Sequence, residues 1–108
     1  MNKPVKVAVV HPDGRVEDKE LDFEGCQKEV GGFVELLKLA PATWAYVNED
    51  GKALGLPENL KATMFCHLCG PNIAASDYIV GPMVVCGANG TRPVSAQALA
   101  ALARIKVV

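Results

Sequence analysis

The sequence lacks a surplus of charge of either sign. Its 108 residues include 11 lysines and arginines and 12 aspartates and glutamates, which leaves a formal net charge of −1. A nucleic-acid binder normally clusters cations on one surface, and an acidic mimic of DNA needs a large negative surplus. The balance argues against both classes, so we expect no nucleic-acid partner.

Long apolar runs are also missing. Half of the residues are apolar, but no run approaches the roughly 18 residues that a membrane-spanning helix requires. The first residues contain only a short apolar stretch and no small-residue cleavage site, so we expect no signal peptide. These features predict a protein of the cytoplasm without a membrane partner.

Histidines are few, and the glycine-rich motifs that bind nucleotides are absent. The chain has two histidines, no GxGxxG and no P-loop. The missing glycine patterns argue against the usual cradles for a dinucleotide or a nucleoside triphosphate. No Ser-His-Asp or Cys-His-Asn order stands out, and few imidazoles are present to act as bases. A non-enzymatic protein is therefore favoured.

What the sequence contains is a series of short strand and helix patterns without repeats or linkers. β-Branched runs and two-residue alternation predict strands over residues 5–10, 15–21, 33–39, 43–47, 78–80 and 83–86. Capping residues and apolar spacing predict helices over residues 22–30, 60–68 and 95–105. The sum is a single α+β domain over residues 1–108. We expect a mainly antiparallel sheet of about five to six strands and two or three helices.

Apolar spacing also predicts which helix faces are buried. In the second helix Leu60, Met64 and Leu68 recur at i, i+4 and i+8, so we expect this stripe to face the core. In the last helix Leu99 and Leu102 are expected to face inward.

Five short segments follow one another in a distinctive order: GGFVE at 31–35, NEDG at 48–51, GLPEN at 55–59, AT at 62–63 and IVG at 79–81. In this order the chain resembles a small domain-of-unknown-function family found in bacteriophages, actinobacteria and other carriers of mobile elements. The resemblance spans nearly the whole chain. It implies an accessory protein of a phage or mobile element, working inside a bacterial cell, and it implies no catalytic residue.

The cysteines offer a metal site. Cys66 and Cys69 form a CxxC pair, and a tetrahedral zinc site takes two ligands from such a pair. Cys86, with Cys26 or His11, would complete the set. The alternative is that these are reduced cytosolic cysteines, some of them buried as small apolar residues.

Acidic and anion-binding residues offer a ligand site. The candidates are Glu35, Asp50, Gly51, Asn59 and Lys61. Glu35 shares a strand face with apolar residues, so we expect it to be partly buried, and with Asp50 it can serve acid–base work or bind a cation. Asn59 and Lys61 open a helix, where backbone amides favour a phosphate. The plainer alternatives are that the carboxylates are solvent-exposed side chains of a turn and that Asn59 is an N-cap.

These patterns leave three functional hypotheses. The first is a non-enzymatic binding module that acts on a host protein or captures a small anionic ligand, with a nucleotide defence signal as the specific form. The second is a zinc-stabilised structural or interaction domain. The third is a small enzyme that uses Glu35 and Asp50. An apolar strand or the alanine-rich last helix further suggests a homo-oligomer interface.

Overall fold

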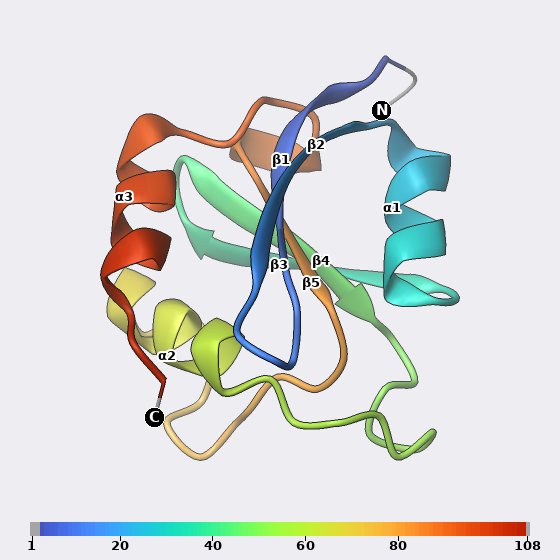
Figure 1. Ribbon diagram of the computed structural model, residues 1–108, viewed down its shortest axis with the longest axis vertical. Coiled ribbons are helices and arrows are strands. Elements are labelled where there is room, and N and C mark those ends of the chain that lie inside the picture. The colour runs from blue at the N-terminus through green and yellow to red at the C-terminus, as the bar shows by residue number, and fades with distance from the viewer. Residues whose placement is uncertain (1–2, 108) are drawn as a thin grey trace.

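Five antiparallel strands form one sheet in the computed structural model, which describes residues 3–107 (Figure 1). The strands are β1 (Val5–Val10), β2 (Val16–Leu21), β3 (Val34–Ala40), β4 (Thr43–Asn48) and β5 (Met83–Cys86). Their order across the sheet is β2-β1-β5-β4-β3, so the hairpins β1–β2 and β3–β4 flank the last strand. The predicted α+β class with a mainly antiparallel sheet is confirmed.

Three helices cover the sheet. They are α1 (Phe23–Val30), α2 (Leu60–Cys69) and α3 (Ala96–Arg104), and a 3₁₀ turn, η1, spans Ala88–Gly90. Each helix begins directly after the residue whose side chain caps it, because an Asp, Asn or Ser oxygen accepts a hydrogen bond from an otherwise unpaired amide of the first turn. The three caps are Asp22, Asn59 and Ser95, as the sequence predicts.

The core has two layers, one on each face of the sheet. Successive strand residues point to opposite faces. In β1, Val7 and Val9 pack with α1, whereas Ala8 and Val10 pack with α2 and α3. Figure 1 shows α1 on one side of the sheet and the other two helices on the opposite side. No helix within residues 3–107 has the length and apolar character needed to cross a membrane.

The face that α2 buries differs from the predicted one. Leu60, Met64 and Leu68 are 51%, 38% and 69% exposed. The buried side chains are instead Phe65, Ala62 and Cys66. The helix is apolar nearly all round, so its spacing allows either stripe to face inward. The large ring of Phe65 buries more apolar surface than a leucine does. In α3, the inward orientation predicted for Leu102 is confirmed.

The segment predicted as a strand at residues 78–80 does not join the sheet. Val80 forms a single bridge with Glu58, and the Asn59 amide donates to the Ile79 carbonyl at 2.8 Å. These bonds tie the segment to the chain that enters α2. Within the described residues the sheet therefore has five strands, and this segment is left to form one side of a pocket.

Candidate functional site

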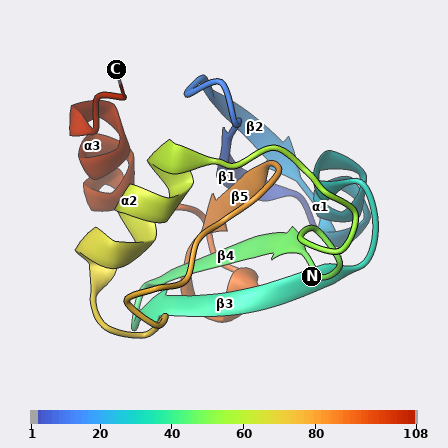
Figure 2. The ribbon, with the colours of Figure 1, turned by 90° about the horizontal axis from the view of Figure 1, so that it is seen from below.

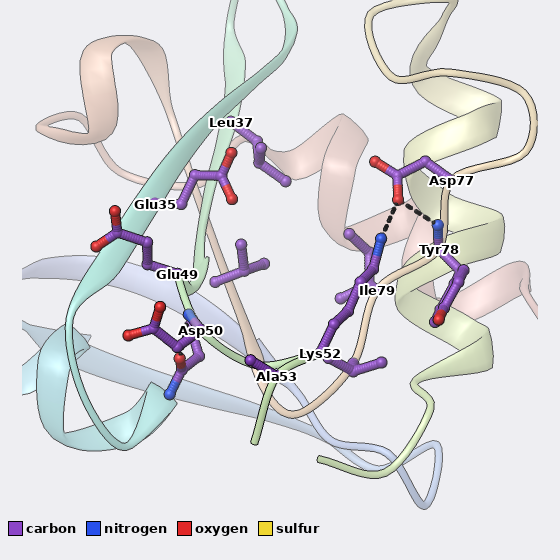
Figure 3. A pocket seen from close by; sticks show the side chains of 12 residues that line it. Glu35, Leu37, Glu49, Asp50, Lys52, Ala53, Asp77, Tyr78 and Ile79 are labelled. Atoms are coloured by element: carbon purple, nitrogen blue, oxygen red, sulfur yellow. Dashed lines mark hydrogen bonds and ion pairs between the residues drawn. The ribbon is translucent and has the colours of Figure 1, made fainter. Parts of the chain in front are cut away.

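A pocket of about 350 Å³ lies between the β3–β4 hairpin and the segment 77–80 (Figure 3). Its polar lining consists of Glu35, Asn48, Glu49, Asp50, Lys52, Asp77 and Tyr78, and its apolar lining of Leu37, Val47, Ala53, Ile79 and Val80. A concave surface that combines apolar area with a few polar groups is the usual form of a ligand site.

The turn after β4 is held in place by Asn48, whose side chain is only 8% exposed. Its Nδ2 donates to the Val30 carbonyl at 2.9 Å, and its Oδ1 accepts from the Asp50 amide at 2.8 Å. Gly51 is buried behind this turn, where a Cβ atom would lie 2.8 Å from Cγ2 of Val80. The Gly51 amide donates to the Asn48 carbonyl at 3.2 Å. Gly51, a predicted ligand residue, therefore serves to close the turn.

Lys52 and Asp77 form an ion pair across the pocket wall (Figure 3). The Lys52 Nζ donates to Oδ1 of Asp77 at 2.5 Å and lies 4.3 Å from the centre of the Tyr78 ring. The hydrogen bond with Asp77 raises the pKa of Lys52 above its ordinary value, with a smaller contribution from the charge of Glu35. The same bond lowers the pKa of Asp77, and the Tyr78 amide lowers it further.

The pocket is strongly acidic. Four carboxylates (Glu35, Glu49, Asp50 and Asp77) and one ammonium group (Lys52) line it, which gives the lining a formal charge of −3. Asp77 is neutralised by Lys52. Within residues 3–107, the three other carboxylates take part in none of the ion pairs. Figure 3 shows these three side chains on the side of the pocket opposite Asp77.

Of the predicted ligand residues, the structure brings Glu35 and Asp50 together in this lining. Glu35 is exposed, not partly buried as expected, because β3 is the last strand of the sheet. Lys61 lies elsewhere, beside Pro12 and Asp13 in a separate groove.

Asn59 is completely buried, and its side chain is fully bonded within the fold. Its Nδ2 donates to the carbonyls of Val10 and Gly81 at 2.9 and 2.8 Å, and its Oδ1 accepts from the Ala62 amide at 3.1 Å. An amide with both hydrogens and its oxygen engaged has little left to offer a ligand. The structure therefore supports the N-cap interpretation and does not place Asn59 in a phosphate site.

The four cysteines are divided between the two faces of the sheet. Cys26 and Cys86 belong to the core layer beside α1, whereas Cys66 and Cys69 pack into the opposite layer. His11 is elsewhere, paired with Glu17. Among residues 3–107, no three His, Cys, Asp or Glu side chains are grouped to hold a metal ion. The proposed zinc set is not assembled, because a sheet separates its members.

The thiols behave as small apolar groups. Burial raises the pKa of Cys26 to about 11 and the pKa of Cys66 and of Cys86 to about 12. The Cys66 Sγ lies 3.7 Å from the sulfur of Met83. Thiols of this kind stay protonated near neutral pH and are poor nucleophiles and metal ligands.

Sequence reasoning missed Lys52, Asp77 and Tyr78 as site residues. Lys52 and Asp77 are 25 positions apart, and neither belongs to a recognisable motif. The one local feature of the sequence that points to Asp77 as a site residue is the polar turn around it. Their juxtaposition follows from the loop that carries the chain from α2 back towards β5.

Comparison with known protein families places this chain in one of them. A family model described as "Domain of unknown function (DUF3846)" matches residues 5–104, which include every helix and strand and all the residues that line the pocket. No curated protein and no solved structure matches the chain significantly. The chain belongs to the DUF3846 family of domains of unknown function.

Proposed function

We propose that this protein is a non-enzymatic binding module whose acidic pocket takes the cationic side chain of an Arg or Lys residue on a partner protein. One observation carries the proposal: the pocket combines apolar walls with three carboxylates that form no ion pair within the described residues. Such a site accepts the alkyl stem of a basic residue along its apolar wall and the charged head at its carboxylates.

A cation is favoured over a nucleotide by the same charges. A phosphate would meet Glu35, Glu49 and Asp50 at short range, and like charges in a concave site repel. Lys52 is already bonded to Asp77. Lys61, the other cation considered for a phosphate, is not in this pocket and lines a separate groove with Asp13 and Lys106.

The setting proposed for this activity is a bacterial cell that hosts a phage or another mobile element. The module would act in the cytoplasm as an accessory protein and occupy a basic segment of a host protein. The resemblance of segments such as GGFVE and GLPEN to proteins of mobile elements supports this setting. Membership of the DUF3846 family is compatible with it.

The test compares two small blocked amino acids whose backbones are uncharged and whose side chains differ by one charge. We would titrate ¹⁵N-labelled protein with Nα-acetyl-arginine methylamide and, separately, with the citrulline analogue, which has nearly the same shape and no charge. The arginine probe is expected to shift the amide signals of Glu35, Glu49 and Asp50 with a dissociation constant on the order of 1 mM, as befits so small a ligand. The citrulline probe is expected to leave them unchanged.

Two matched variants assign the effect to the pocket. Glu35→Gln removes a lining carboxylate, and Glu20→Gln removes an exposed carboxylate of β2, at the opposite edge of the sheet. Weaker arginine binding is expected in the first variant only. Equal responses to the arginine and citrulline probes, or equal losses in the two variants, would refute the proposal.

A further inference from the structure

The outer edge of β3 is open. β3 ends the sheet at one side, and among residues 3–107 no strand pairs with its outer edge. Figure 2 shows β3 along the rim of the sheet, with the loop after α2 near one end of the strand. There the Leu39 carbonyl accepts a hydrogen bond from Nδ2 of Asn72 at 3.2 Å. The open stretch therefore runs over residues 34–38.

The pairing with β4 shows which backbone groups face outward. The Glu49 amide donates to the Phe33 carbonyl at 2.9 Å, one step beyond the Val34–Asn48 pair of the register. In an antiparallel pair, alternate residues direct their N–H and C=O groups to the partner strand and the residues between them direct theirs away. The outward groups are therefore those of Val34, Leu36 and Lys38.

The two edge strands of the sheet differ in how well they are protected against pairing with another strand. β2, the other edge strand, has the sequence VEDKEL, in which four of six residues are charged. Charged side chains on an edge strand prevent another strand from adding to it. The open stretch of β3 reads VELLK, and Leu36 is 39% exposed. Of these two edge strands, β3 therefore has the less charged edge, with Leu36 exposed beside its unpaired backbone groups.

The open edge and the acidic pocket share residues. Glu35 and Leu37 of β3 both line the pocket. A strand added antiparallel to β3 would bond to Val34, Leu36 and Lys38, which leaves Glu35 and Leu37 in non-hydrogen-bonded positions, where facing side chains come closest. A basic residue opposite Glu35 would therefore direct its side chain to the pocket carboxylates.

We infer that the partner is an extended protein segment that adds to β3 as a sixth strand and places an Arg or Lys residue opposite Glu35. This inference rests on the proposed function for the choice of a basic residue. β3 also specifies the neighbouring positions: apolar residues opposite Leu36 and Leu37, and an acidic residue opposite Lys38. Backbone bonds to the edge supply affinity, and alternate side chains supply specificity.

Three peptides test the two parts separately. The first is acetyl-Thr-Glu-Val-Val-Arg-Val-Thr-amide. In antiparallel register its five central residues lie opposite β3 residues 38 to 34, in that order, which places Arg opposite Glu35. The second replaces Arg by citrulline. The third is N-methylated at the valine that precedes Arg, opposite Leu36, which removes one ladder donor and leaves the side chains unchanged. We expect each change to weaken binding about tenfold or more, as the loss of a backbone or charge-assisted hydrogen bond does.

Amide hydrogen exchange locates the bound peptide. With saturating peptide, the exchange rates of the Val34, Leu36 and Lys38 amides are expected to fall about tenfold or more, because each amide gains a hydrogen-bond acceptor. The amides of Glu35 and Leu37, which face β4, are expected to change little. This alternation distinguishes an added strand from a ligand that merely covers the surface.

The outcomes separate this inference from the proposed function. If the citrulline peptide binds as tightly as the parent while N-methylation abolishes binding, strand addition stands and the cationic pocket fails. If N-methylation has no effect, or the three edge amides are not protected, strand addition is refuted. A further outcome is that the same amides are protected without peptide, to a degree that increases with protein concentration. That result would show that a second copy of the chain occupies the edge, and it would also refute strand addition by a partner segment. So would a failure of all three peptides to bind.

Discussion

The Lys52 ammonium group lies 2.5 Å from a carboxylate oxygen of Asp77, although the two residues are 25 positions apart. This bond places one positive charge in the lining of an otherwise acidic pocket. A cation that enters the pocket meets Lys52 as a repelling neighbour and the carboxylates as partners. We therefore expect the Lys52 ammonium group to lower the affinity of the site for the proposed basic ligand.

Replacing this lysine tests the sign of the ligand charge. In Lys52→Gln we expect the arginine-containing peptide to bind about 3- to 10-fold more tightly, because a like charge close to the ligand is removed. The free energy of unfolding is expected to change by about 1 kcal/mol or less, since the pair is at the surface. Calorimetric titration and urea unfolding measure the two quantities. Lys28→Gln, on the exposed side of α1, is the control. Unchanged or weaker peptide binding in Lys52→Gln would contradict a cationic ligand in this pocket.

Asn59 is expected to contribute much more to stability than an ordinary helix cap. Asn59→Ala removes the cap of α2 and also leaves the buried carbonyls of Val10 and Gly81 without their donor. We expect a loss of about 2–4 kcal/mol in the free energy of unfolding, from a cap worth about 1 kcal/mol and two further buried hydrogen bonds. Ser95→Ala removes only the cap of α3 and should cost about 1 kcal/mol. Equal losses in urea unfolding would contradict the assigned role.

Local chemistry made much of this fold predictable. Asp22, Asn59 and Ser95 identify the helix starts, because a cap depends on residues within one turn. Alternation along β3 places Leu37 and Leu39 against the same core layer. These features require no knowledge of distant residues.

Features that depend on distant contacts were not predictable. Spacing alone does not reveal that Cys66 and Cys86 lie on opposite faces of the sheet, because this depends on which strands the chain pairs. The same holds for the pair between Lys52 and Asp77. Two of the four carboxylates of the candidate site, Glu35 and Asp50, followed from the sequence, but their common pocket followed only from the tertiary structure.

The reversed orientation of α2 gives a simple mutational test. Leu68→Gln replaces a side chain that is 69% exposed and is expected to change the free energy of unfolding by about 0.5 kcal/mol or less. Phe65→Ala removes a ring that is fully buried and is expected to cost about 3–5 kcal/mol. Chemical denaturation of both variants measures the difference. A larger cost for Leu68→Gln than for Phe65→Ala would mean that the predicted stripe faces the core after all.

The buried thiols predict that the protein loses stability in mild alkali. Burial raises the pKa of Cys66 to about 12 from an ordinary value of 9.0, and Cys86 behaves in the same way. Between these pH values the unfolded chain releases protons that the folded chain retains, so the free energy of unfolding falls as the pH rises. The contribution is intact below pH 9, and each such thiol is expected to cost about 1.4 kcal/mol at pH 10.

Urea unfolding at pH 8, 9 and 10 measures this loss, and Cys66→Ala isolates one thiol. The variant is expected to be less stable than the parent at pH 8, because the substitution leaves a small cavity. Its stability should nevertheless decline less between pH 8 and pH 10, by about 1.4 kcal/mol. Comparing slopes removes the cavity effect, which does not depend on pH. Identical slopes for the parent and the variant would show that the Cys66 thiol ionises as readily in the folded protein as in the unfolded chain, and would contradict the packing found for α2 against the sheet.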